Sequence, residues 1–145
     1  MLLYNSVLEG IFCRRPNRFI AYVDIDGKTE KVHVKNTGRC KELLVPGCTV
    51  YLDKLDNPNR KTAYDLVAVM KGDTLINMDS VAPNKVFGQW AKENYPGAII
   101  KPEVKYKNSR FDFYIEQGDR KIFTEVKGVT LEENGIVKFP DAPTE

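Results

Sequence analysis

Apolar and polar residues alternate with a period of two along most of the first half of the chain, which is the pattern of half-buried strands. Pairs of turn-forming residues separate the runs, and Asp26-Gly27 is the clearest hairpin signal among them. The pattern predicts five short strands: Val7–Cys13, Phe19–Ile25, Thr29–Val34, Cys48–Leu55 and Tyr64–Met70.

A different pattern separates the third strand from the fourth. The stretch N-T-G-R-C-K-E-L-L-V-P-G, from Asn36 to Gly47, predicts a short helical turn that Pro46-Gly47 ends. Five strands with one small helical element in this place are typical of an OB-fold barrel, whose face and loops often bind oligonucleotides. The alternative is another small five-stranded barrel without a ligand.

The second half of the chain begins with a helix signal. Lys71-Gly72-Asp73 marks a boundary, so we expect one domain over residues 1–75 and a second over 76–145. In the second, Ser80 or a neighbour can cap a helix over Ala82–Asn94 with proline in its first turn. Ile99–Tyr106 predicts the strand that follows it.

Arg110–Val129 predicts a hairpin. Phe111, Phe113 and Ile115 alternate with polar residues, and Gly118-Asp119 separates this run from a second one that begins at Ile122. If these two residues form the turn, Gln117 pairs with Arg120. Continuing that register places Asp112 directly opposite Glu125, with Lys127 on the same face as Glu125.

Two carboxylates so placed need a compensating cation, because like charges opposite each other in a hairpin are destabilising. Lys127 or Arg110 can supply it as a structural ion cluster. A Mg2+ or Mn2+ ion is the other candidate, with Asp112 and Glu125 as ligands and the Val126 carbonyl as a further one. Such a metal beside a lysine is suited to phosphodiester hydrolysis. Glu103 becomes a third acid of this group if the preceding turn is Lys107-Asn108.

Charge is unevenly distributed along the 145 residues, although the net charge is only +2. Between Arg14 and Lys41 there are eight basic residues and three acidic ones. A basic front half predicts binding to a polyanion such as a nucleic acid, and a solvated basic surface is the alternative. The candidate nucleic-acid contacts are Arg14, Arg15, Arg18, Lys35, Arg39, Arg60 and Lys61.

Composition argues against several other classes. The sequence is 42% hydrophobic and 29% charged, as in ordinary globular proteins, and no apolar run approaches a membrane span. The N-terminus does not have the pattern of a signal peptide. Three cysteines without a C-x-x-C pair indicate reduced thiols, and His33 is the sole histidine. We therefore expect a cytoplasmic protein without a zinc site or a membrane partner.

Several motifs together resemble the sugar fermentation stimulation protein A family. They are R-P-N-R-F at 15–19, N-T-G at 36–38, P-G at 46–47, S-R-F-D-F at 109–113, E-V-K-G-V-T-L at 125–131 and F-P-D-A at 139–142. The resemblance implies a mainly β, α+β protein in which an OB-fold domain precedes a partial α/β domain similar to the PD-(D/E)xK nucleases. It also implies binding to double-stranded DNA and a role in regulating sugar, especially maltose, metabolism genes, and it leaves a homodimer open.

The nuclease motif of that family carries over to three residues. Asp112 matches its aspartate, and Glu125-Val126-Lys127 matches its E-x-K. Such nucleases often place a glutamate on their first helix, where this chain has Asn84 near the start and Glu93 near the end. Family members also continue past F-P-D-A, so the chain resembles a truncated fragment. A non-catalytic ligand- or protein-interaction module on a degenerate nuclease scaffold is the alternative function.

Overall fold

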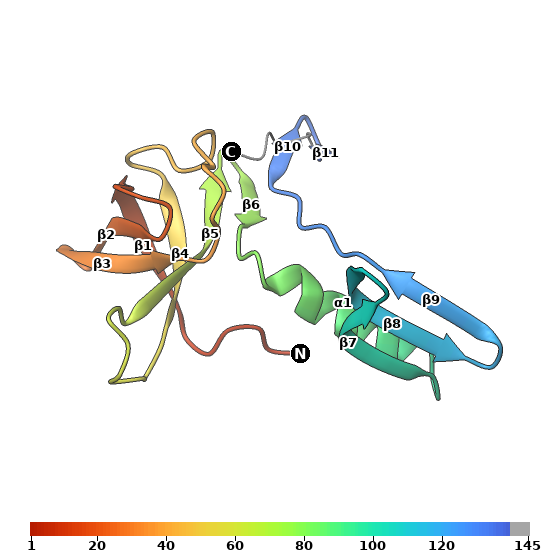
Figure 1. Cartoon of the computed structure of the whole chain (residues 1–145). Helices are drawn as coiled ribbons and strands as arrows, with labels where there is room; N and C mark the ends of the chain where they lie inside the picture. The colour runs from red at the N-terminus through yellow and green to blue at the C-terminus, as the bar shows by residue number, and fades with distance from the viewer. Residues whose placement is uncertain (140–145) are drawn as a thin grey trace. The chain divides into compact units, whose positions relative to one another are not determined.

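The computed structural model describes residues 1–139, so the end of the F-P-D-A motif lies outside the described residues. The chain divides into two compact units (Figure 1). The barrel unit contains Leu2–Ser80 and the segment that begins at Val129, and the helix–sheet unit contains Val81–Gly128 and Met1. Within the described part of the chain, no helix is long and apolar enough to cross a lipid bilayer.

The barrel unit is built on one six-stranded sheet. Its strands are β1 (Val7–Arg14), β2 (Ile20–Ile25), β3 (Lys28–Val34), β4 (Thr49–Lys54), β5 (Tyr64–Lys71) and β6 (Thr74–Asn77). They follow the order β3-β2-β1-β4-β5-β6. Parallel pairing of β3 with β5, at His33↔Asp65 and Val34↔Leu66, closes the first five strands into a barrel. The predicted OB-fold barrel is therefore confirmed.

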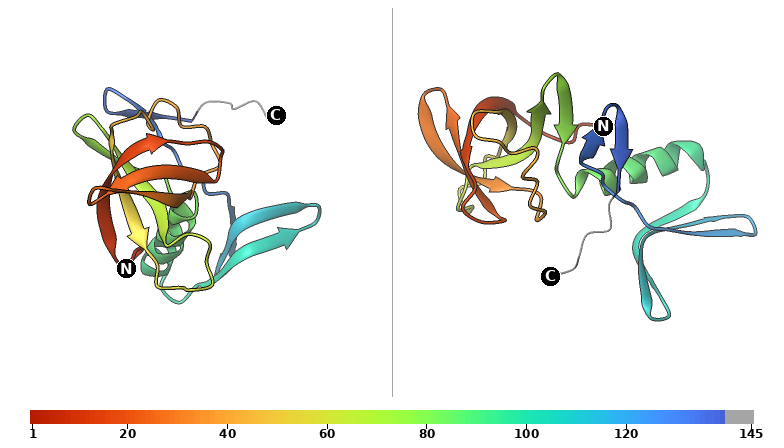
Figure 2. Two further views of the ribbon diagram at one scale, coloured as in Figure 1. Left: turned by 90° about the vertical axis from the view of Figure 1, so that its left-hand side faces the viewer. Right: turned by 90° about the horizontal axis from the view of Figure 1, so that it is seen from above.

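The apolar residues of the predicted alternating strands fill the interior of this barrel. In β2, every second residue is buried, beginning with Ala21 and Val23. Gly10 on β1 allows the close approach of the Val23 side chain from β2, since a Cβ there would lie 2.6 Å from Cγ1 of Val23. Leu52 and Leu66 are completely buried in the same core, where a Leu→Ala substitution costs about 2–5 kcal/mol. Figure 2 shows the curved strands of this unit from two further directions.

Two local features of the barrel unit refine the predictions. Gly72-Asp73, which the sequence marks as a boundary, instead joins β5 to β6, with Lys71 opposite Thr74. Between β3 and β4, the predicted helical turn is a single turn in which the Leu44 amide donates to the Cys40 carbonyl at 2.9 Å. It does not extend toward Asn36, because the carbonyls of that stretch accept hydrogen bonds from Arg15.

A small hairpin that the sequence did not predict belongs to the same unit. It consists of β10 (Leu131–Glu133) and β11 (Ile136–Lys138). The ammonium of Lys71, at the end of β5, donates to the Glu132 carbonyl and lies 3.7 Å from the Glu132 carboxylate. These contacts attach the hairpin to the barrel unit.

The helix–sheet unit packs one helix on a three-stranded meander. Its elements are α1 (Ala82–Asn94), β7 (Ile99–Tyr106), β8 (Ser109–Gln117) and β9 (Arg120–Thr124), with strand order β7-β8-β9. The Phe113 ring lies 5.0 Å from the Phe87 ring of the helix, and Ile115 is buried. Proline occupies the first turn as predicted, but the N-cap residue is Val81, which makes no side-chain cap. The helix is therefore held by its packing on the sheet.

Candidate nucleic-acid interface and carboxylate corner

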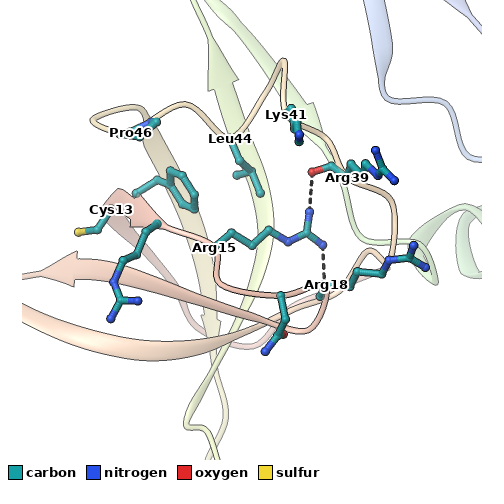
Figure 3. Close-up of a pocket in the computed structure, with 10 residues that line it drawn as sticks. Cys13, Arg15, Arg18, Arg39, Lys41, Leu44 and Pro46 are labelled. Carbon is teal, nitrogen blue, oxygen red and sulfur yellow. Dashed lines mark hydrogen bonds between the residues drawn. The ribbon is translucent and has the colours of Figure 1, made fainter.

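A cleft of about 530 Å3 opens in the barrel unit between the β1–β2 loop and the β3–β4 loop (Figure 3). It is lined by Phe12, Cys13, Arg14, Arg15, Asn17, Arg18, Arg39, Lys41, Leu44 and Pro46. All ten belong to the described residues. Half of them are arginine or lysine, and none is a carboxylate. We call this the cationic cleft.

Arg15 holds the two loops of the cleft together. Its guanidinium donates four hydrogen bonds to backbone carbonyls, all of them 2.6–2.8 Å long. One acceptor, Arg18, is on its own loop, and the others are on the β3–β4 loop at Asn36, Gly38 and Arg39. Burial lowers the pKa of the Arg15 guanidinium. With its two terminal nitrogens bonded to backbone carbonyls, Arg15 shapes the cleft.

The N-T-G-R stretch is a tightly constrained turn. The Asn36 side chain accepts from the Gly38 amide at 2.8 Å and donates to the Met78 carbonyl at 2.9 Å. Because that amide is engaged and three carbonyls of the stretch face Arg15, the turn does not present converging amides to a phosphate. Its contribution to the cleft is to position the side chain of Arg39.

The remaining cations line the cleft with exposed side chains. Arg14 and Arg18 come from the β1–β2 region, and Arg39 and Lys41 come from the β3–β4 loop. The Arg14 guanidinium lies 4.0 Å from the centre of the Tyr22 ring, a cation–π contact that leaves its outer face available for stacking. Burial raises the pKa of the Cys13 thiol, so this group adds no negative charge near neutral pH.

Lys35 and Arg60 are directed to a different place. Asp65 is buried, and it accepts two hydrogen bonds from the Arg60 guanidinium. The Lys35 ammonium lies 4.0 Å from Asp65 and 3.5 Å from the buried Asp79. His33 is also part of this group, with Nδ1 3.3 Å from the Asp65 carboxylate. We call these residues the buried ion cluster.

The other candidates in the barrel unit lie apart from both groups. Lys61 is exposed on the β4–β5 loop and does not line the cleft. Among the aromatic residues, Phe19 is 56% exposed and remains available for stacking, whereas Tyr64 packs against the core. An OB-fold is expected to bind with its β1–β2 and β4–β5 loops. Here the second loop of the cleft is the one between β3 and β4.

The hairpin of the helix–sheet unit has the register that the sequence predicts. Gln117 pairs with Arg120, and the pairing continues to Phe113↔Thr124. Gly118, the first turn residue, has a φ of +59°, which favours glycine. The ladder stops before Glu125, because the next amide, that of Val126, donates to the Asp112 carboxylate at 2.7 Å. A second donor, Asn84 Nδ2 on the helix, lies 3.2 Å from the other Asp112 oxygen.

The three acids predicted for this corner have separate partners. The Lys127 ammonium lies 2.7 Å from the Glu125 carboxylate, and this hydrogen bond raises the pKa of Lys127. Glu103 accepts from Arg110 at 3.1 Å on the exposed surface of the unit. Within residues 1–139, no three His, Cys, Asp or Glu side chains are grouped so as to hold a metal ion. We call Asp112, Asn84, Glu125 and Lys127 the carboxylate corner.

Two residues of the sites described above, Lys41 in the cleft and Asn84 in the corner, are not among the site residues that the sequence predicts. Lys41 belongs to the basic stretch, but only the fold of the β3–β4 loop brings it to the cleft. Asn84 stands near the start of the helix, where the nuclease resemblance directs attention to an acid. Glu93, the other helix candidate, accepts from Gln89 at 2.9 Å. The position of Asn84 was therefore informative, although its side chain is an amide.

Comparison with known proteins matches both units. A family model described as the SfsA N-terminal OB domain matches residues 13–78, and one described as the sugar fermentation stimulation protein RE domain matches residues 81–145. Sugar fermentation stimulation protein homologs from Clostridium beijerinckii and Desulfitobacterium hafniense are 65% and 62% identical to the chain, over 98% of its length. The chain covers 64% and 63% of these two relatives.

A solved structure described as Pyrococcus furiosus SfsA in complex with Ca2+ is also similar. It superposes with a TM-score of 0.82 and 30% sequence identity, over 96% of this chain and 62% of that one. The chain therefore spans somewhat less than two thirds of the length of these relatives.

Proposed function

The chain belongs to the sugar fermentation stimulation protein family, and from that premise we propose that its barrel unit binds DNA through the cationic cleft. The observation that carries the proposal is that five cations and no carboxylate line one cleft of an OB-fold barrel. Cations that contact phosphates release condensed counterions, so the affinity is expected to fall steeply as the salt concentration rises.

Fluorescence anisotropy with a labelled DNA duplex, repeated over a salt series, tests this proposal. Each lost phosphate contact lowers the slope of log affinity against log salt by about one. We therefore expect the double variant Arg18→Ala/Lys41→Ala to lower that slope by about two. Lys61→Ala is the matched control, because it removes an exposed lysine of the same unit that lies outside the cleft. Equal affinities for wild type and double variant would contradict the proposal.

The finer part of this proposal concerns the genes that are bound. The relatives carry the name of sugar fermentation stimulation. We place the DNA target in duplex regions that control sugar metabolism genes, those of maltose in particular. Retention of fragmented genomic DNA by the purified protein tests this part. Enrichment no greater for control regions than for coding DNA would limit the function to binding without sequence preference.

For the carboxylate corner, we propose a hard divalent cation, Mg2+ or Mn2+, held by Asp112 and Glu125. The donor set fits, because carboxylate and carbonyl oxygens are the ligands such ions prefer, and the Val126 carbonyl is a third candidate. Asp112 accepts hydrogen bonds from two neutral donors, Asn84 Nδ2 and the Val126 amide, and neither of them neutralises its charge. The description of the Pyrococcus furiosus relative as a Ca2+ complex supports this choice.

Such an ion would supply Lewis-acid chemistry for phosphodiester hydrolysis. Within this chain, Asn84 and the Val126 amide orient Asp112, and Lys127 stands beside Glu125 with its ammonium exposed. Calorimetric titration of Mn2+ into wild type and Asp112→Asn tests the binding. Equal heats would show that the acids serve the fold. Incubation with DNA and Mg2+, scored for cleavage, tests hydrolysis separately.

A second function is favoured by a specific observation in the same corner. Glu125 and Lys127 form an ion pair with each other, and both oxygens of Asp112 already accept hydrogen bonds. These contacts also fit a non-catalytic interaction module on a nuclease-like scaffold. Retention of DNA by the barrel unit without metal-dependent cleavage, together with equal Mn2+ heats, would identify that function.

A further inference from the structure

The dimensions of the cationic cleft limit what can enter it. A space of about 530 Å3 is within the range of small-ligand sites, roughly 300–1,000 Å3. An intact duplex is too wide to enter such a cleft. One nucleotide, with its base, sugar and phosphate, is of the right size. The interior of a duplex can therefore lie only across the mouth of the cleft.

The charge in the cleft exceeds what one internal phosphate requires. A phosphodiester in a strand carries a single negative charge, whereas a phosphomonoester carries about −1.5 to −2 near pH 7. Beside the internally bonded Arg15, the exposed cationic side chains of Arg14, Arg18 and Lys41 line the space. Because no carboxylate is among the lining residues, this density of positive charge matches a dianion better than a monoanion.

The walls of the cleft provide a complementary apolar surface. Phe12, Leu44 and Pro46 line it beside the cations. The Arg14 guanidinium is held against Tyr22, and a planar guanidinium supported in this way is a stacking surface for a base. The cleft thus combines charge for a phosphate with apolar and planar surface for a base and sugar.

The shape of this cleft is preorganised. The four hydrogen bonds of Arg15 fix the β1–β2 loop to the β3–β4 loop, and Figure 3 shows Arg15 between Arg18 and Arg39. The Asn17 side chain adds rigidity to the first loop by accepting from the amides of Phe19 and Ile20. A ligand therefore does not have to order these loops when it binds.

We infer that the cationic cleft binds one nucleotide bearing a phosphomonoester, such as the 5′-phosphorylated terminal nucleotide of a DNA strand or a free nucleoside monophosphate. This inference rests on the proposed DNA-binding function and narrows it, since it assigns to the cleft the phosphorylated end of a strand. Internal phosphates of the same DNA then lie across the mouth of the cleft.

Calorimetric titration of the full chain with dAMP, deoxyadenosine and inorganic phosphate tests the inference without any DNA. We expect dAMP to bind more tightly than phosphate, and deoxyadenosine to give no measurable heat. Arg18→Ala/Lys41→Ala should weaken dAMP binding at least about tenfold, because hydrogen bonds to charged groups are lost. Lys61→Ala should leave it unchanged. Circular dichroism confirms that each variant is folded.

A second arm compares labelled single strands that differ only in a 5′-phosphate or a 5′-hydroxyl. Tighter binding of the phosphorylated strand, with competition by dAMP, supports the strand end as the source of the nucleotide. Binding of dAMP with equal affinities for the two strands assigns the cleft to a free nucleotide. Absence of dAMP binding with equal affinities for both strands overturns the inference, and salt-dependent duplex binding would then still support the proposed function. If the wild-type chain binds dAMP but does not bind a DNA duplex, only the proposed function is overturned.

Discussion

The cationic cleft and the carboxylate corner use their charges in opposite ways. In the cleft, the arginine that is most fully hydrogen-bonded binds backbone carbonyls, and no carboxylate lines the space beside the other cations. In the corner, each acid has an internal donor: Asn84 and Val126 for Asp112, and Lys127 for Glu125. A surface lined by charges of one sign therefore suggests an external partner more strongly than a site in which each acid already accepts a hydrogen bond from the same unit.

The buried ion cluster shows the same distinction inside one unit. The sequence predicts Lys35 and Arg60 as nucleic-acid contacts together with the arginines of the cleft, because all are basic. Their side chains instead contact Asp65 and Asp79, which are both 4% exposed. All of these basic residues belong to the barrel unit, but only the contacts separate the cations that line the cleft from those that pair with buried acids.

Removal of the Arg15 guanidinium is expected to have the largest effect. Arg15→Ala leaves four backbone carbonyls without their charged donor, so we expect a loss of about 3 kcal/mol in the free energy of unfolding. Urea denaturation measures it. Arg15→Lys should recover only part of the loss, because an ammonium cannot bridge all four acceptors. Arg18→Ala, on the exposed surface of the same loop, should change stability by about 0.5 kcal/mol or less. An unchanged urea midpoint for Arg15→Ala would contradict the role of Arg15 in joining the β1–β2 and β3–β4 loops.

Neutralisation of the buried ion cluster is expected to have the second largest effect on the free energy of unfolding. Asp65→Asn removes the carboxylate that faces Arg60, Lys35 and His33, and we expect about 2 kcal/mol of destabilisation. The estimate is below that for fully buried pairs because Arg60 and His33 are partly solvated. The affinity for DNA, measured on the folded fraction, should not change. A loss of affinity comparable to that of Arg18→Ala/Lys41→Ala would show that this cluster also contacts the ligand.

A substitution in the carboxylate corner should reduce the free energy of unfolding less than the two substitutions in the barrel unit. Asp112→Asn replaces a charged acceptor of the Val126 amide by a neutral side chain, which we expect to cost about 1 kcal/mol. Asn84→Ala removes the other donor and serves as the comparison. If Asp112→Asn destabilises much less than this and also abolishes the Mn2+ heat, the acid serves a metal more than the fold. A stability loss with unchanged Mn2+ heat would indicate the opposite.

The effect predicted for Tyr4 is confined to alkaline pH. Burial raises its pKa to about 12, and its hydroxyl donates to Asp79 at 3.2 Å. A tyrosine whose pKa is higher in the folded state contributes stability that is present below pH 10 and is lost as the pH rises toward 12. Urea denaturation between pH 9 and 12 should therefore show a steeper decline for wild type than for Tyr4→Phe. Parallel declines would show that the hydroxyl does not titrate differently on folding.

Much of the fold could be predicted from the sequence because its signals are local. Period-2 alternation located the five barrel strands, and Asp26-Gly27 and Gly118-Asp119 fixed two hairpin registers, with Ile25 opposite Lys28 and Gln117 opposite Arg120. The sequence pattern does not predict β6, because Gly72-Asp73 resembles a domain boundary, whereas it forms the turn of a hairpin. The β10–β11 hairpin was missed because its strands have three residues each, too few to establish a period.

The candidate sites depended on longer-range information. The sequence alone determined that this chain forms a closed OB-fold barrel with a basic front half, and that the second hairpin has the register that runs to Phe113 opposite Thr124. Only the tertiary structure decided that Arg15 is a joining residue, that Lys41 faces the cleft, and that Lys35 and Arg60 neutralise buried acids. The physical reason is that strand alternation and turns are set by neighbouring residues. The partner of a charged side chain is chosen among loops that are distant in sequence and meet only after the barrel has closed.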